Sequence, residues 1–340
     1  MITYPRGVRI PDLETATVAR LAGLLATGRV TSVGLVQACL DRIAALDHLN
    51  AVRAVNPAAL TEAAAADRRR GGLLNGIPVL VKDNIDVKGM PTTAGSVALA
   101  DSDPDRDATL VTNLRAAGAV ILGKANLTEF ANVMAYDMPS GYSSLGGQVL
   151  NPYDASRTPS GSSSGSAVAA AAGLVPLTVG SETSGSILSP ASACSVVGIK
   201  PTVGLISRTG ILPVAASQDT AGPMTRTVAD AAALLTALSS VDPHDAATAA
   251  NPLADHDFTG DLHTDALAGA RIGVVDAEGD LWAAALDDLR ARGATLVPVD
   301  IDVTSSIAGG SSVLNYELNA TSTPTSPACR PARRCGRSPR

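Results

Sequence analysis

Aromatic residues, lysine and charge are all scarce in this 340-residue sequence. Aromatic side chains make up 2% of the chain and charged ones 17%, whereas 46% of the residues are hydrophobic. This composition excludes an intrinsically disordered chain, which would be rich in charge and poor in apolar residues. We therefore expect a compact globular protein whose core is filled mainly by Ala, Val and Leu.

Long apolar runs and paired cysteines are also absent from the sequence. No stretch approaches the ~18 apolar residues of a membrane-spanning helix, and the N-terminal MITYPRGVRIPDLE lacks the layout of a secretion signal. The four cysteines form neither a C-x-x-C pair nor a Cys/His ligand cluster. We therefore expect a cytoplasmic protein with reduced thiols, no membrane contact and no bound metal. The cysteines are Cys39, Cys194, Cys329 and Cys335.

The net charge of −6 is unevenly distributed along the chain. Residues 320–340 contain five arginines and no acidic residue, so the remainder is more acidic and is expected to repel nucleic acid. The same segment has four prolines and no Leu, Ile, Val or Phe, and can bury little. We predict one domain over residues 1–319 and a basic, disordered tail over 320–340. A nucleic-acid-binding arm and a departure from the natural reading frame near Glu317 are the alternatives.

Apolar spacing predicts an alternation of helices and strands, which is typical of an α/β sheet. Residues 158–199 contain one charged side chain, Glu182, so this stretch is expected inside the molecule. Ser32 is the expected N-cap of its helix, and residues 181–190 are expected to form a glycine- and serine-rich turn. The predicted helices cover residues 15–25, 32–46, 107–117, 163–172, 227–239 and 282–292, and the predicted strands cover 77–81, 119–122, 174–180, 271–275 and 294–297.

The segment 159–166 contains a G-x-S-x-G pattern with Ser163 at its centre. In α/β-hydrolases such a serine is a nucleophile on a sharp turn that follows a strand, and a later histidine activates it. Here a turn sequence, NPYDASRTPS, precedes the pattern, and the later histidines lie in a Pro/Asp-rich stretch. The pattern is therefore weak support for Ser163 as a nucleophile. The histidines in question are His244, His256 and His263.

Lysine is another base that can activate a serine. Lys82 directly follows the apolar strand 77–81, and burial there can lower its pKa by about 3 units, enough for a neutral base near pH 7. The alternative is a plain ion pair of Lys82 with Asp83 or Asp86, and strand geometry alone does not decide between the two. The other lysines are Lys88, Lys124 and Lys200, of which we expect the last two to tie loops to carboxylates.

A second serine- and glycine-rich turn, GSETSGSI at residues 180–187, follows a predicted core strand. Its small residues let consecutive backbone N–H groups point at one spot, as an oxyanion hole requires. An ordinary tight turn is the alternative. Of the two serine-rich segments, this one is the better place for a nucleophile.

Five long segments resemble the amidase signature family. They occur in the order found in that family and span most of residues 10–320, so the match is far more specific than a pentapeptide. The likeness is greatest to bacterial peptide amidases and related amidases, in the runs GGQVLNPY and SQDTAGPM. The segments are GIPVLVKDNID (76–86), GAVILGKANLTEFAN (118–132), SGSSSGSAVAAAAGLVPLTVGSETSGSILSPAS (160–192), GIKPTVGLISRTGILP (198–213) and SQDTAGPMTRTVADAA (217–232).

The resemblance implies a mixed β-sheet core flanked by helices and a Ser–cis-Ser–Lys catalytic triad. By motif position the base is Lys82, the bridging serine, preceded by a cis peptide, is Ser162, and the nucleophile is Ser186. Neutral Lys82 would take a proton from Ser162, which deprotonates Ser186 as it attacks an amide carbon and forms an acyl-enzyme. No metal or cofactor is implied. The residues expected to bind the substrate oxyanion through their backbone are Thr183, Ser184 and Gly185, together with Ser186 itself.

The implied substrate is a small carboxamide or the C-terminal carboxamide of a peptide. Two alternatives stay open: a glutaminase-type subunit of a tRNA-dependent amidotransferase, which needs partner subunits, and a truncated, inactive protein of the same fold. The second arises because relatives usually continue well beyond residue 340 and the likeness stops after Glu317, so we expect the fold to lack its C-terminal part. The sequence also leaves a homodimer open.

Several residues near the expected triad have less certain roles. Glu182 stands where many members of the family have Asp, a change that shifts the subfamily and not the mechanism. Cys194 is expected to be a buried apolar residue, and Asp219 is expected to order its loop. Ser163 is expected to pack or hold the loop, with a contact to the triad as the alternative.

Overall fold

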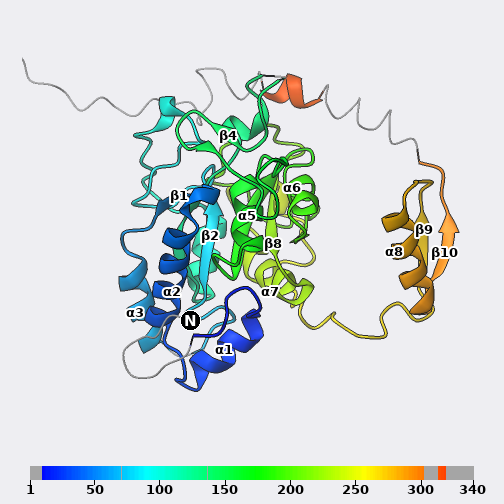
Figure 1. Cartoon of the computed structure of the whole chain (residues 1–340), viewed down its shortest axis with the longest axis horizontal. Coiled ribbons are helices and arrows are strands. Elements are labelled where there is room, and N and C mark those ends of the chain that lie inside the picture. Colours follow the sequence, from blue (N-terminus) through cyan, green and yellow to red (C-terminus); the bar gives the residue numbers. More distant parts are fainter. Residues whose placement is uncertain (1–9, 70, 136, 302–312, 319–340) are drawn as a thin grey trace, which may run out of the picture.

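The computed structural model describes residues 10–69, 71–135, 137–301 and 313–318, and its centre is a six-stranded sheet (Figure 1). The strand order is β1-β3-β2-β6-β8-β7. β2 is parallel to β3 and β6, whereas the other pairs are antiparallel, so the predicted mixed sheet is confirmed. The strands are β1 Val52–Val55, β2 Pro78–Lys82, β3 Val120–Ala125, β6 Leu177–Glu182, β7 Val197–Gly198 and β8 Thr220–Thr225.

The central strands are buried along their whole length. Every residue of β2, β3, β6 and β8 is buried. Near-continuous apolar runs are typical of strands covered on both faces, which is why Val79, Leu80 and Val81 predicted β2 well. The strand extends one residue further than predicted, so Lys82 is its last residue and lies at the carboxyl end of a central strand.

Helices flank this sheet, with α2 and α3 against β2 and β3 and with α5 and α7 against β6 and β8 (Figure 1). The expected N-cap Ser32 is wrong by one residue: Thr31 has the extended backbone and accepts from the Gly34 amide. Ser32 instead donates its hydroxyl to Gly76 O. The helices are α1 Val18–Ala26, α2 Ser32–Ala45, α3 Ala59–Arg68, α4 Thr109–Ala116, α5 Ser164–Ala171, α6 Leu188–Ala193, α7 Val228–Leu238 and α8 Asp280–Ala291, with short 3-10 turns at Asp47–Leu49, Val97–Leu99, Glu129–Asn132 and Ala246–Thr248.

The predicted turn over residues 181–190 is too long. Ser181 and Glu182 pair with Ala221 and Thr220 of β8 and so belong to β6. Pairing with a neighbouring strand overrides their polar character. At the other end α6 starts at Leu188; Pro190 falls in its first turn, where a missing N–H costs little. The turn that remains covers residues 183–187.

A second, smaller unit follows the main sheet in the chain. Strands β9 (Arg271–Val274) and β10 (Thr295–Pro298) are parallel and carry α8 between them, close to their predicted positions. They form a sheet of their own and lie apart from the six-stranded sheet (Figure 1). A two-residue hairpin pair, β4 (Tyr142–Ser143) and β5 (Gly147–Gln148), was not predicted.

The predicted tail over residues 320–340 lies outside the described residues. Across the ranges that are described, no helix combines the length and the apolar character that crossing a bilayer requires.

Candidate active site

Lys82 and Ser162 are in direct contact at the carboxyl end of β2. Lys82 Nζ lies 2.7 Å from Ser162 Oγ, and both residues are fully buried. Ser162 comes from the loop just before α5, and its peptide bond with Gly161 is cis, as the resemblance implied. Its carbonyl accepts a hydrogen bond from the Thr128 amide. Two of the three expected catalytic side chains are therefore brought together.

Burial lowers the pKa of Lys82 from 10.5 to about 7, although the negative charges of Glu182 and Asp219 oppose part of this shift. The alternative of a plain ion pair between Lys82 and the neighbouring acids is wrong. Asp83 pairs instead with Arg53 and with Lys124. Burial thus favours the uncharged amine of Lys82, in contact with the Ser162 hydroxyl.

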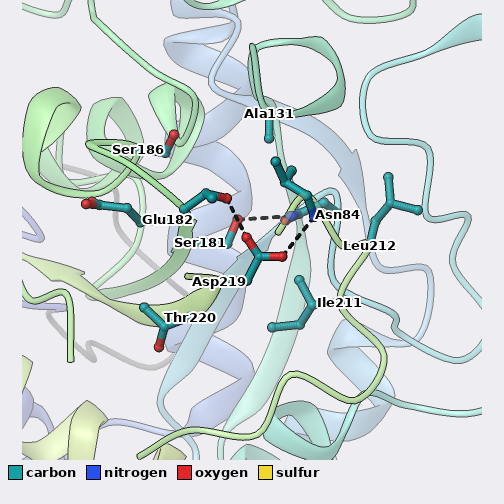
Figure 2. Close-up of a pocket in the computed structure, with 11 residues that line it drawn as sticks. Asn84, Ala131, Ser181, Glu182, Ser186, Ile211, Leu212, Asp219 and Thr220 are labelled. Atoms are coloured by element: carbon teal, nitrogen blue, oxygen red, sulfur yellow. Dashed lines mark hydrogen bonds between the residues drawn. The ribbon is translucent and has the colours of Figure 1, made fainter. Parts of the chain in front are cut away.

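Ser186 lies on the turn between β6 and α6 and lines a small pocket (Figure 2). It is 8% exposed, and its carbonyl accepts a hydrogen bond from the Ser163 amide, the residue after Ser162. In the described part of the chain no hydrogen bond joins the hydroxyls of Ser162 and Ser186. The expected nucleophile thus lies near the Lys82–Ser162 pair. The hydrogen bond between the Ser186 and Ser162 hydroxyls that a proton relay requires is not formed in the described structure.

Glu182 holds the turn that carries Ser186. One carboxylate oxygen accepts from the Gly185 amide at 2.7 Å, and the other accepts from Ile187 at 2.7 Å and Leu188 at 3.0 Å. A carboxylate at this place satisfies amides at the start of α6 that have no partner within the helix. Gly185 has φ +82°, a conformation that favours glycine.

The amides expected to bind an oxyanion are differently placed. The Gly185 amide donates a hydrogen bond to the Glu182 carboxylate. The amides of Thr183, Ser184 and Ser186 make no hydrogen bond within the described ranges.

Asp219 orders its loop, as predicted. Its carboxylate accepts from the amides of Val214 and Ala215 and from the Thr183 hydroxyl. Burial raises the pKa of Asp219, while these hydrogen bonds lower it. Asp219 therefore fixes one wall of the pocket and ties it to the turn of Ser186.

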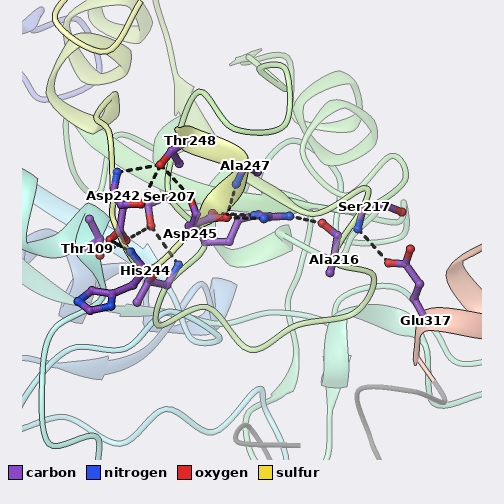
Figure 3. Close-up of polar contacts among 12 residues, drawn as sticks. Thr109, Ser207, Ala216, Ser217, Asp242, His244, Asp245, Ala247, Thr248 and Glu317 are labelled. Atoms are coloured by element: carbon purple, nitrogen blue, oxygen red, sulfur yellow. Dashed lines mark hydrogen bonds and ion pairs between the residues drawn. The ribbon is translucent and has the colours of Figure 1, made fainter. Parts of the chain in front are cut away.

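The pocket at Ser186 has a volume of about 10 Å³, enough for about one water molecule. A larger depression of about 210 Å³ adjoins it and shares Ile211 and Asp219 with it. An ion pair of Arg208 with Asp245 lies along this depression, and Glu317 accepts from the Ser217 amide nearby (Figure 3). The small pocket at Ser186 thus adjoins a wider depression across Ile211 and Asp219. Besides Ser186, the small pocket is lined by Asn84, Ala131, Ser181, Glu182, Thr183, Ile211, Leu212, Val214, Asp219 and Thr220.

Ser163 holds strand β6 through its hydroxyl, and its amide contacts an expected catalytic residue through the hydrogen bond to the Ser186 carbonyl. The Ser163 hydroxyl donates to Ser181 O and accepts from the Ser181 amide. None of the described strands leads into the G-x-S-x-G segment, and His256 pairs with Asp261 elsewhere. The nucleophile-turn alternative for Ser163 is therefore wrong.

Sequence reasoning missed Asn84 and Ser181, which line the pocket next to Lys82. Asn84 Nδ2 donates to Ser181 Oγ at 2.9 Å, and Lys82 Nζ lies 3.0 Å from the same oxygen. The available signal was the position of Asn84 two residues after Lys82, and that of Ser181 immediately before Glu182.

The remaining predictions concern Lys124 and Cys194. Lys124 is fully buried, pairs with Asp83 and donates to Ile85 O and Thr92 Oγ1, so it ties loops together as predicted. Cys194 is buried, and burial raises the pKa of its thiol to about 12, which makes it a poor nucleophile. Among the described residues no three His, Cys, Asp or Glu side chains gather as a metal site requires.

Comparisons with known proteins show which family the chain resembles in sequence and in structure. A family model described as Amidase matches residues 34–322. A probable amidase of Arabidopsis thaliana is 45% identical over 84% of this chain and 58% of its own length. A glutamyl-tRNA(Gln) amidotransferase subunit from Chloroflexus aggregans is 43% identical over 86% of this chain and 62% of its own length. The X-ray structure of native peptide amidase from Stenotrophomonas maltophilia superposes with a TM-score of 0.87 at 48% identity, over 90% of this chain and 66% of that chain.

The chain thus spans about 58–66% of the length of these relatives. The matched region includes Lys82, Ser162 and Ser186. The similarity in structure confirms the predicted sheet flanked by helices. By the match of the family model and by these identities, the chain belongs to the Amidase family.

Proposed function

We propose that this chain hydrolyses a carboxylic amide through an acyl-enzyme, with Ser186 as nucleophile, Ser162 as proton relay and Lys82 as base. The observation that carries the proposal is the buried Lys82 amine, which lies 2.7 Å from Ser162 Oγ and has a pKa lowered to about 7. A base is most effective when its pKa lies near the working pH.

Each step moves one proton along the same path. Lys82 takes the proton of Ser162, and Ser162 takes that of Ser186 as Ser186 Oγ bonds to the amide carbon. The proton then returns through Ser162 to the leaving nitrogen, and ammonia or an amine departs. Water attacks the ester by the same relay and frees Ser186.

The oxyanion of each tetrahedral intermediate would be held by backbone amides of the turn. Thr183, Ser184 and Ser186 supply donors that are not bonded elsewhere in the described chain. Donors held in place before the reaction stabilise developing charge without reorganisation, and one such donor is typically worth about 3–4 kcal/mol. The Glu182 carboxylate keeps this turn in shape.

The proposed substrate is a small carboxamide or a peptide C-terminal carboxamide. Two observations support it: the space of about one water at Ser186, which suits a small leaving group, and the 48% identity with a peptide amidase. Ammonia release from peptide amides by the full chain is the direct test. Ser186→Ala should abolish turnover while Ser163→Ala retains most of it, and equal losses would contradict the assignment.

A second candidate is the glutaminase-type subunit of a tRNA-dependent amidotransferase, because several such subunits are 43–44% identical to this chain. Glutamine hydrolysis that appears only with partner subunits would favour it. The third candidate is an inactive protein of this fold. A fluorophosphonate probe that labels Ser186 in the folded chain would exclude it, and absence of labelling would support it.

A further inference from the structure

The buried amine of Lys82 has three oxygen partners. Besides Ser162 Oγ at 2.7 Å, Nζ lies 3.0 Å from Ser181 Oγ and 3.1 Å from Ser181 O. Ser181 is 7% exposed and lies on β6, the strand next to β2. The proposed relay uses Ser162 alone, so two of the three contacts have no role in it.

The charge state of Lys82 determines what each oxygen can do. An ammonium group has three N–H donors and no acceptor, so these three oxygens satisfy it completely. A neutral amine has two N–H donors and one lone pair, which needs an O–H donor. The relay works only when Ser162 is that donor. The hydroxyl and carbonyl of Ser181 must then both accept from Lys82.

Other contacts hold Ser181 in the orientation that this requires. Asn84 Nδ2 donates to Ser181 Oγ at 2.9 Å. The Ser163 hydroxyl bridges the amide and the carbonyl of Ser181, at 3.2 and 3.0 Å. A hydroxyl oxygen has two lone pairs and can accept from Asn84 and Lys82 together. The oxygen atoms of Ser181 are thus fixed toward Nζ from two sides.

We propose that Ser181 is a positioning residue for the proton relay, an inference that rests on the proposed function. Its two oxygens hold the amine so that the remaining lone pair faces Ser162. They also supply two of the three acceptors that the ammonium needs after proton transfer. In that step the O–H bond of Ser162 breaks and an N–H bond forms on Lys82. The electron pair stays on Ser162 Oγ, which then takes the proton of Ser186.

The charges around Lys82 would be unchanged by a substitution at Ser181. Glu182 on β6 and Asp219 before β8 both favour the ammonium. Asp83 on β2 is paired with Lys124 of β3 and Arg53 of β1. Two helices pack against β2. Helix α5 has no titratable side chain, and the buried titratable side chain of α2 is Cys39. Burial raises the pKa of the Cys39 thiol to about 12, so it carries no charge near neutral pH.

The scarcity of lysine makes a direct test practicable. With 13C-labelled lysine the chain gives one set of signals for each of four lysines, and Lys82→Arg identifies that of Lys82. Ser181→Ala should lower the pKa of Lys82 by about one unit or more, because the ammonium loses an acceptor. Ser181→Thr keeps the hydroxyl and should titrate like the wild type. The matched control is Ser166→Ala, which removes another buried hydroxyl bonded to β6 and should not change the titration.

The pH dependence of fluorophosphonate labelling at Ser186 gives a second measurement. In Ser181→Ala its acid limb should move to lower pH and its plateau should fall, whereas a purely structural loss lowers the rate without moving the limb. Should Ser181→Ala fail to fold, Ser181→Cys replaces the oxygen by a weaker acceptor of similar size. A wild-type titration of Lys82 in the folded variant would overturn the proposal. Absence of labelling in the wild type would count against the proposed function, and the lysine titration requires no turnover.

Discussion

The carboxylate of Glu182 accepts a hydrogen bond from the Gly185 amide at 2.7 Å, across the turn that carries Ser186. Its other oxygen bonds to the Ile187 and Leu188 amides. We predict that Glu182→Gln lowers the free energy of unfolding by about 1–3 kcal/mol, because an uncharged amide accepts more weakly and at one oxygen only. The labelling rate of Ser186 should fall with it. Urea unfolding and probe labelling measure the two effects.

Glu129→Gln is the matched control for this change. The Glu129 carboxylate also accepts from a backbone amide, that of Ser144 at 2.7 Å, but far from the turn in the chain. We expect a small loss of stability and an unchanged labelling rate. Equal losses of labelling in both variants would show that the contacts of Glu182 do not shape the site.

The proposed base predicts a specific pH dependence of nucleophile activation. Lys82 accepts a proton only when neutral, and its pKa is about 7. The labelling rate of Ser186 should therefore rise about tenfold per pH unit below that value and level off above it. A rate that does not change through neutral pH in the folded protein would exclude Lys82 as the base.

Stability should also depend on pH, in a direction that the burial of Lys82 fixes. The unfolded chain keeps this proton up to about pH 10.5 and the folded chain only up to about 7, so stability rises with pH between these values. Below about pH 7 the folded protein must bury the charged ammonium of Lys82, which lowers the free energy of unfolding by about 5 kcal/mol relative to high pH. Lys124, with a pKa lowered to about 8, acts in the same direction.

Lys82→Met should therefore flatten the rise in unfolding free energy between pH 7 and about 10, measured by urea titrations at several pH values. Lys88→Met, at an exposed position, should keep the wild-type slope. If both variants retain that slope, Lys82 is not the buried titrating group.

The sequence predicted the structure correctly where the local residue pattern and the burial in the fold agree. The apolar run before Lys82 predicted a buried strand, and the family motifs indicated Lys82 and Ser162, which the structure brings into contact. Cys194 was also assigned correctly, because an uncharged thiol in a segment as poor in charge as residues 158–199 is expected to be buried. The loop role of Asp219 is confirmed by its hydrogen bonds to the Val214 and Ala215 amides.

The predictions were wrong where contacts between residues far apart in the sequence determine the local structure. Ser181 and Glu182 are polar and follow Gly180, which indicates a turn, yet pairing with β8 makes them strand. The same pairing directs Ser181 at Lys82, a contact across 99 positions that no local pattern reveals. The bond between Glu182 and Gly185 likewise depends on the path of the folded turn and removes one of the amides expected to bind the oxyanion.

Two glycines provide a final prediction about how close α5 must lie to the sheet. A Cβ at Gly165 would lie 2.3 Å from Asn126 O and 2.4 Å from Ala51 O, both backbone atoms that cannot move aside alone. Gly165→Ala should therefore cost about 3 kcal/mol or more of unfolding free energy. Gly23 in α1 has no atom within 4 Å of such a Cβ, so Gly23→Ala should stabilise by about 0.5–1 kcal/mol. Urea unfolding of both variants checks the pair, and a Gly165→Ala protein as stable as the wild type would show that α5 is not packed this closely.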